Sequence, residues 1–561
     1  MRIFKSIVQF ISNNTIWVLI LVYVYIRSLY WDCLPIWDGM LHYSNLIDAI
    51  QSPFNILNYS QDAHNCEGFM LLMALPYKLY NGSYYAFNIW VTIFSLLSIV
   101  GFYELLLFFL KERISKHEIV MITALFAFHP TVLGSMIHFT IDMGVLTFFI
   151  LYWVMLLKEK RLATGIFALL LLFSKETAML LLPLPFLFGL FLQPTPRRVS
   201  WLKEFSKYFY TKSNSGHVVL VPLPVLFRSL FKPSPERILW FKRHFLILLI
   251  PYLLLGLFIL YKVFIGHQPA LSYVLDNDVA VLDYFGSDGK FINYLGMIFI
   301  LNFNWILTLL WLILFIMLLI RWRLINDLFQ KRLSKNLTLL VLGVLFVLTL
   351  AVSWSTPRYV MLMVPLILLA IAQLSAILIS SRYIRISALL ILLVLFFIED
   401  ERTIDPVSKI FFGKTISFGH HELINTKNRT NEDSYEKTRD QLVYNLEYLK
   451  IRQLLNVIYS DIRPTSETYF IFKASTLDRT IYPLDSNYKM ALQGNNLITP
   501  KIVAVYNTYY LPALPGETYL VDLPNADNTD LIEVLNKYYS YKTVKVYERD
   551  GYQINVIHYK K

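Results

Sequence analysis

The chain has little charge and almost no cysteine. Charged residues make up 16% of its 561 positions, whereas hydrophobic residues make up 56%. Two cysteines cannot by themselves complete a zinc or iron–sulfur site, so metal chemistry of that kind is not expected. The C-terminal part lacks a glycine-rich phosphate loop, a metal-ligand spacing and a nucleophile elbow. A function must therefore be sought in the hydrophobic part of the chain.

Apolar residues come in blocks of about 20, roughly the length that crosses a bilayer as a helix. The sequence thus predicts a polytopic α-helical membrane protein with about eleven transmembrane helices. Its first apolar run is long and lacks a small-residue cleavage site before Trp31, so no cleavable signal peptide is expected. The predicted spans are 12–30, 84–110, 118–134, 139–157, 161–174, 176–192, 245–265, 292–320, 337–353, 359–380 and 386–399.

The net charge of +12 is distributed as in a membrane protein rather than a nucleic-acid-binding protein. Lysine and arginine collect in alternate loops, which are cytoplasmic by the positive-inside rule, and acidic residues collect in others. This pattern predicts a cytoplasmic N-terminus and an extracytoplasmic C-terminal part. The short loops favour a bacterial plasma membrane by analogy. The basic groups lie within 111–116, 158–161, 197–243, 321–335 and 382–385, and the acidic groups within 32–67 and 276–288.

Both cysteines, Cys33 and Cys66, fall in the predicted first outer loop, 31–83. They are either a disulfide on the oxidising side of the membrane or two unrelated small apolar residues, and the sequence leaves both interpretations open.

The predicted basic cytoplasmic loop, 193–244, contains most of a tandem duplication. The segment that begins at Pro183 recurs from Pro222, an offset of 39 positions without a gap. Charged residues interrupt the second copy, which favours an amphipathic segment on the inner membrane surface. A degraded membrane span is the alternative, and the acidic loop at 276–288 argues against it.

The composition changes after Glu399, which predicts two domains, 1–399 in the membrane and 400–561 outside it. The second has ordinary charge density, a helical stretch near 434–457, and the alternating runs "TYFIF", "KIVAVY", "TYLVDL" and "YQINVIHY". We expect a soluble extracytoplasmic α/β domain.

Ionisable residues at the outer ends of the spans are the candidate functional residues, because charge at membrane depth is costly and usually functional. A site with one carboxylate and several cations at the lipid–water boundary suits a substrate with an anionic head and a long apolar tail, such as a polyprenyl-phosphate sugar. The candidates are Asp38, His64, Glu67, His129, His138, Asp142, Lys175, Glu176 and Arg358.

Five motifs around these residues occur in order over roughly 12–400. They are "WDGMLHY", "DAHNCEGFMLLMALPYKLYNG", "HPTVLGSMIHFTIDMGV", "SKETAMLLLPLP" and "WSTPRYVMLMVP". In them the chain resembles the GT-C superfamily of membrane glycosyltransferases, in the branch with protein O-mannosyltransferases and the lipid A aminoarabinose transferase. Gly39 stands where the family has a second acid, and Asn65 and Cys66 stand where it has prolines.

The resemblance implies inverting transfer of a sugar from a polyprenyl-phosphate donor to an acceptor hydroxyl, on a lipid, a glycan or a protein of the cell envelope. Asp38 would be the general base, while Arg358 and Lys175 would bind the donor phosphate. No cofactor is implied, and Gly39 disfavours a divalent metal. His64, Glu67, His138, Asp142 and Glu176 would be further site residues. Asp142 would either orient the acceptor or hold a cation such as Arg358 in place.

Each candidate also has a purely structural interpretation. Asp38 would cap the helix that follows it, Arg358 would extend from a span end towards water, and Lys175 with Glu176 would form an ion pair. A histidine beside an apolar face is often structural. At the level of function, a secondary transporter or a non-catalytic protein that binds or flips lipid-linked sugars remains the alternative.

Overall fold

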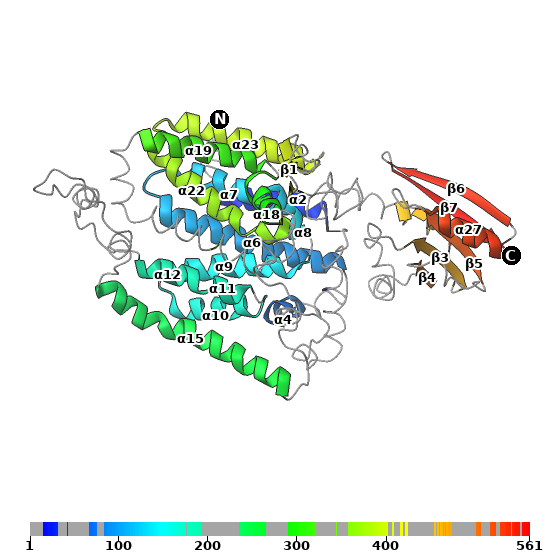
Figure 1. Cartoon of the computed structure of the whole chain (residues 1–561), viewed down its shortest axis with the longest axis horizontal. Coiled ribbons are helices and arrows are strands. Elements are labelled where there is room, and N and C mark those ends of the chain that lie inside the picture. Colours follow the sequence, from blue (N-terminus) through cyan, green and yellow to red (C-terminus); the bar gives the residue numbers. More distant parts are fainter. Residues whose placement is uncertain are drawn as a thin grey trace, which may run out of the picture.

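The computed structural model of the chain separates a helical part from a C-terminal sheet (Figure 1). The structure describes part of the chain, as a set of continuous ranges and some isolated positions. The isolated positions include 42 and 46 and several between 407 and 465. The continuous ranges are 15–31, 67–75, 84–137, 139–175, 177–191, 235–264, 290–301, 303–320, 357–401, 416–418, 421–424, 467–473, 501–505, 516–522, 528–539, 541–549 and 552–560.

Helices make up nearly all of the described chain up to Glu401. They are α2 (Thr15–Ser28), α4 (Glu67–Ala74), α6 (Tyr84–Leu110), α7 (Lys116–Ala127), α8 (Pro130–Ile137), α9 (Ile141–Leu157), α10 (Arg161–Leu172), α11 (Ala178–Leu181), α12 (Pro183–Phe191), α15 (Pro235–Phe264), α18 (Lys290–Phe299), α19 (Asn304–Ile320), the 3-10 turn η1 (Pro357–Val360), α22 (Met363–Leu378) and α23 (Arg382–Glu401).

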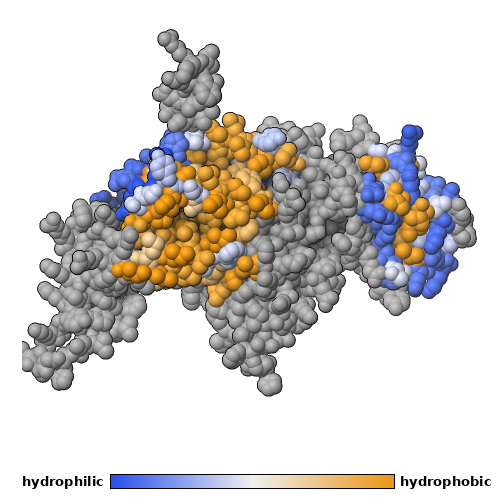
Figure 2. All heavy atoms as spheres, turned by 90° about the horizontal axis from the view of Figure 1, so that it is seen from above, coloured by the Kyte–Doolittle hydropathy of each residue, from blue (hydrophilic) through white to orange (hydrophobic). Residues whose placement is uncertain are grey.

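The helical part has the surface of an integral membrane protein. Among the described residues, Phe87–Leu110 and Ile238–Lys262 are long and apolar enough to cross a membrane, and six further apolar helices are shorter. Figure 2 shows a broad apolar surface over the helices, whereas hydrophilic residues are frequent on the C-terminal part. The predicted number of eleven spans stays a prediction, and the second copy of the duplication before Pro235 lies outside the described residues.

Two predicted spans are interrupted by a residue or bend that leaves helical geometry. Within 118–134, α7 and α8 meet at a bend of 57°, because Pro130 lacks an N–H and disfavours helical backbone at His129. Within 292–320, α18 and α19 are separated at Phe303, whose φ of 60° lies in the left-handed region. Sequence periodicity alone gave continuous spans at both places.

A polar ladder fixes the end of the first span. Asn88, Thr92 and Ser95 lie at helical spacing on α6 and face α2. The Tyr23 hydroxyl donates to Ser95 Oγ at 3.2 Å, and Trp31 Nε1 donates to Thr92 Oγ1 at 2.9 Å. Asn88 Nδ2 donates to the Trp31 carbonyl at 2.8 Å. Hydrogen bonds between membrane helices hold their relative position, so the chain leaves α2 at a fixed point beside α6.

Helix α9 is the centre of the helical core, since almost every residue from Ile141 to Val154 is buried. It packs against α6 and α10. The Phe69 ring of α4 lies over Gly144, where a Cβ atom would be 2.7 Å from Phe69 Cδ2. Glycine at position 144 thus lets α4 approach the first turn of α9.

The start of α4 is fixed to the end of α10 by a second close approach. The Gly68 N–H donates to the Phe173 carbonyl at 3.0 Å, and a Cβ at Gly68 would lie 2.6 Å from Phe173 Cβ. We expect Gly68→Ala to lower the free energy of unfolding by about 1–3 kcal/mol, the usual cost of overpacking. Unfolding of the purified protein in increasing sodium dodecyl sulfate measures this change.

Gly256→Ala is the matched control, because a Cβ at Gly256 in α15 has no atom within 4 Å. Alanine favours a helix over glycine by up to about 1 kcal/mol, so this variant should be neutral or slightly stabilised. Equal destabilisation of both variants would contradict the packing argument.

The C-terminal part contains a five-stranded sheet in the order β4-β3-β5-β7-β6. Strands β4 (Lys501–Val505), β3 (Thr468–Lys473) and β5 (Glu517–Asp522) run parallel to one another. Strand β7 (Tyr552–Lys560) runs antiparallel to both of its neighbours, β5 and β6 (Tyr541–Arg549). The four alternating runs of the sequence are β3, β4, β5 and β7. Strands β1 (Ile416–Phe418) and β2 (His421–Ile424) form a separate hairpin.

One face of this sheet packs on helix α27 (Thr529–Tyr538) through Ile471, Leu520 and Leu535. Near β6, Asp461 accepts hydrogen bonds from Lys545 and from the Tyr547 hydroxyl, and these donors lower the pKa of its carboxyl group. The division of the chain at 399 and the side of the membrane on which this sheet lies stay predictions, as does the helix near 434–457, which falls mostly outside the described residues.

Candidate functional site

Three of the predicted site residues meet in one ion-pair cluster. Lys175 Nζ lies 2.7 Å from Asp142 Oδ1, and Arg358 Nε lies 3.3 Å from Asp142 Oδ2. The three side chains are 4–10% exposed. Because each residue comes from a different part of the chain, the cluster joins three segments around one carboxylate.

Local structure places each member of the cluster. Asp142 lies in the first turn of α9, where a carboxylate interacts favourably with the helix dipole. Lys175 follows the end of α10, and its carbonyl accepts from Ala178 N at 3.0 Å as the chain turns into α11. Arg358 lies in η1, directly after Pro357. All three side chains therefore project from helix ends or turns.

The cluster has a fourth member, Tyr359, which the sequence analysis did not identify. The Lys175 ammonium lies 4.1 Å from the centre of its ring, and Arg358 Cζ lies 5.1 Å from it. Arg358 Nη2 also contacts the Tyr359 hydroxyl at 3.4 Å. An aromatic face attracts both cations, and most strongly where water is excluded. The only signal in the sequence was its position next to Arg358, in a chain with 37 tyrosines.

A small, partly open cavity borders the cluster. Asp142, Lys175, Arg358 and Tyr359 line one part of it, and Thr177 with apolar residues such as Leu181 lines the rest. Its described lining residues carry two positive charges and one negative charge. The cavity therefore combines a basic surface with apolar walls, an arrangement suited to an anionic group attached to an apolar chain.

Two further parts of the chain approach this region. Glu67 is the first residue of α4, and its neighbour Gly68 hydrogen-bonds to Phe173, two positions before Lys175. His42, in the predicted first outer loop, packs edge-on against Phe139 with ring centres 6.5 Å apart. Phe139 lies just before α9, so both contacts bring the predicted outer segments towards the cluster.

Six predicted site residues lie outside the described residues, and their roles stay predictions. They are Asp38, His64, His138, Glu176, Cys33 and Cys66. In the part of the chain that is described, no group of three or more histidine, cysteine, aspartate or glutamate side chains could hold a metal ion.

His129 has a structural role. Its Nδ1 accepts from the Thr131 N–H at 3.3 Å, so Nε2 carries the proton and donates to Asn304 Oδ1 at 2.8 Å. The ring is fully buried and packs against Phe396. The residue thus joins the α7–α8 bend to the start of α19.

No family model and no curated protein matches the chain. Two solved structures are similar to it, those of ArnT from Cupriavidus metallidurans in the apo state and bound to undecaprenyl phosphate. Each is 12% identical, with a TM-score of 0.46 over 97% of this chain and 98% of the other. At these values the similarity carries no argument about activity, which must come from the residues of this chain.

Proposed function

We propose that the protein is a membrane glycosyltransferase that moves a sugar from a polyprenyl-phosphate donor to an acceptor hydroxyl at the extracytoplasmic face. The supporting observation is the cavity in which Arg358 and Lys175 stand beside Asp142 and Tyr359 against apolar walls. An anionic sugar–phosphate head attached to an isoprenoid tail matches both surfaces. The motifs that resemble the GT-C superfamily supply the reaction type.

Arg358 and Lys175 would stabilise the leaving phosphate. Sugar transfer breaks the bond between the anomeric carbon and the phosphate oxygen, so negative charge grows on the leaving group. Cations that are already oriented stabilise this charge without reorganisation. The guanidinium fork can bind two phosphate oxygens at once, whereas the ammonium acts as a point charge.

Asp142 would be a positioning residue. Without substrate it neutralises part of the positive charge of the cluster and holds both cations towards the cavity. A carboxylate between two buried cations lowers the cost of removing them from water. The donor phosphate would then contact cations whose side chains are already ordered.

Asp38 would be the general base that takes the proton of the acceptor hydroxyl, so that attack on the anomeric carbon proceeds with inversion. It precedes His42 by four positions, and His42 packs against Phe139, three positions before Asp142. A phosphate leaving group needs no strong acid, so one carboxylate is sufficient.

Binding of polyprenyl phosphate to the purified protein tests the phosphate site. Hydrogen bonds to charged groups contribute about 1.5–3 kcal/mol, so we expect Arg358→Ala to weaken binding about 10- to 100-fold. Arg358→Lys keeps the charge but lacks the guanidinium fork, so its affinity should lie between those of the unaltered protein and Arg358→Ala. Asp142 remains paired with Lys175 in both variants, so both should fold.

Lys158→Ala is the control, because it removes a half-exposed lysine that pairs with Glu104 outside the cavity. Unchanged affinity in Arg358→Ala would refute the phosphate site. Weaker binding without any detectable sugar transfer by the unaltered protein would instead indicate a protein that binds or flips lipid-linked sugars.

A further inference from the structure

A second polar network lies at the other end of α22. Arg358 and the proposed site precede this helix, whereas the second network contacts the residues that follow it. Sixteen helical residues rise about 24 Å, so the two regions are well separated. The network contains Arg382 and Arg385, which belong to a predicted cytoplasmic loop. It is therefore expected at the inner face of the membrane.

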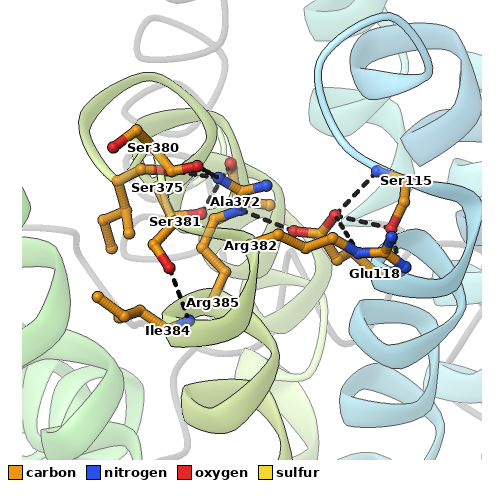
Figure 3. A network of polar contacts seen from close by, with 10 residues as sticks. Ser115, Glu118, Ala372, Ser375, Ser380, Ser381, Arg382, Ile384 and Arg385 are labelled. Atoms are coloured by element: carbon orange, nitrogen blue, oxygen red, sulfur yellow. Dashed lines mark hydrogen bonds and ion pairs between the residues drawn. The ribbon is translucent and has the colours of Figure 1, made fainter.

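Glu118 is the centre of this network (Figure 3). Ser115 caps α7, with its N–H donating to Glu118 Oε2 at 2.9 Å and its Oγ accepting from the Glu118 N–H. Arg385 Nε donates to Glu118 Oε1 at 2.7 Å, and Arg385 Nη1 also contacts the carbonyls of Ile379 and Ser380. Glu118 and Arg385 are thus fully engaged in joining α7 to the α22–α23 turn.

Arg382 occupies a different position in the network. Its Nε lies 3.9 Å from Glu118 Oε2, and its side chain is 51% exposed. Glu118 therefore faces two arginines with one carboxylate. The charge of Arg382 remains accessible at the first residue of α23, which is a suitable position for an anion that approaches from the membrane surface.

A partly open cavity extends from this network between α7, α19, α22 and α23. Its walls are aliphatic, with Leu125, Leu307, Leu368 and Leu392 contributed by the four helices. Among its described lining residues only Glu118, Ser375 and Arg385 are polar.

We propose that this cavity holds an acyl chain of an anionic phospholipid whose phosphate group pairs with Arg382. The aliphatic walls match the acyl chain, and the excess arginine at one end matches the headgroup. Basic pockets between membrane helices at the cytoplasmic side are suited to anionic lipids. The site shares no lining residue with the cavity around Asp142 and is independent of the proposed glycosyl transfer.

Native mass spectrometry of the full-length protein with phosphatidylglycerol or phosphatidylcholine of identical acyl chains tests the proposal. We expect one phosphatidylglycerol to be retained in preference to phosphatidylcholine. Arg382→Ala should reduce that preference about fivefold, the usual effect of one basic residue at a charged lipid surface. Arg382 is half exposed, so this variant should fold normally.

Ala388→Trp tests the cavity itself, because Ala388 lines it and an indole would occupy the space of the acyl chain. Ser387→Trp is the matched control, since Ser387 is exposed on the same helix and does not line the cavity. We expect lipid retention to be lost only in Ala388→Trp. Equal binding of both lipids by the unaltered protein, or an unchanged preference in Arg382→Ala, would overturn the proposal even if Ala388→Trp failed to fold.

Discussion

Asp38→Asn should insert into the membrane and bind polyprenyl phosphate normally, yet lose almost all sugar transfer. Asparagine keeps the size of the side chain but cannot accept the acceptor proton. Removal of a positioned general base typically lowers the rate about 10²- to 10⁴-fold. The envelope glycans of a deletion strain identify the sugar of the proposed donor. Turnover of that labelled polyprenyl-phosphate sugar by the purified protein then measures the change.

The structural interpretation of Asp38 makes a different prediction. Loss of a helix N-cap costs about 1 kcal/mol, and asparagine caps nearly as well as aspartate. Asp48→Asn is the matched control, because it removes a carboxylate from the same predicted outer loop. Near-normal transfer by a stably inserted Asp38→Asn protein would leave Asp38 as a cap and remove the general base from the proposal.

Asp142→Ala should destabilise the folded protein more than Gly68→Ala does. Lys175 and Arg358 would remain buried near each other, with side chains 8% and 4% exposed, without the carboxylate between them. Breaking a buried ion pair by removing one partner typically costs about 3–5 kcal/mol. Unfolding in sodium dodecyl sulfate, followed by the loss of helical circular dichroism, measures this cost.

A double-mutant cycle separates the ion-pair effect from a loss of packing. Adding Lys175→Met to Asp142→Ala removes one of the two buried cations that lose the carboxylate and should restore part of the stability. Glu104→Ala is the control, because its pair with Lys158 is 34–39% exposed and exposed pairs contribute about 0–1 kcal/mol. Equal costs for Asp142→Ala and Glu104→Ala would show that the buried cluster contributes no special stability.

The sequence was informative wherever a physical cost applies to single residues. Charge at membrane depth is so unfavourable that Asp142, Lys175 and Arg358 could be selected from a hydrophobic chain without knowledge of their neighbours. The apolar blocks located most of the described helices for a similar reason, since an unpaired backbone cannot cross lipid. Alternation of apolar residues likewise located β3, β4, β5 and β7.

The tertiary structure decided which of these residues meet. The sequence suggested that Asp142 could hold a cation such as Arg358. It did not indicate that Asp142 would also pair with Lys175, or that Tyr359 would contact both cations, because these contacts depend on how α9, α10 and η1 pack. The sequence left His129 between a site residue and a structural histidine, and its partner Asn304, 175 positions away, appears only in the folded chain. Arg385 belongs to a predicted basic loop and Glu118 begins a predicted span, and although they are 267 positions apart they form one ion pair. The cost of burying a charge can be estimated from one residue, whereas the partner that offsets it is chosen only when distant segments pack together.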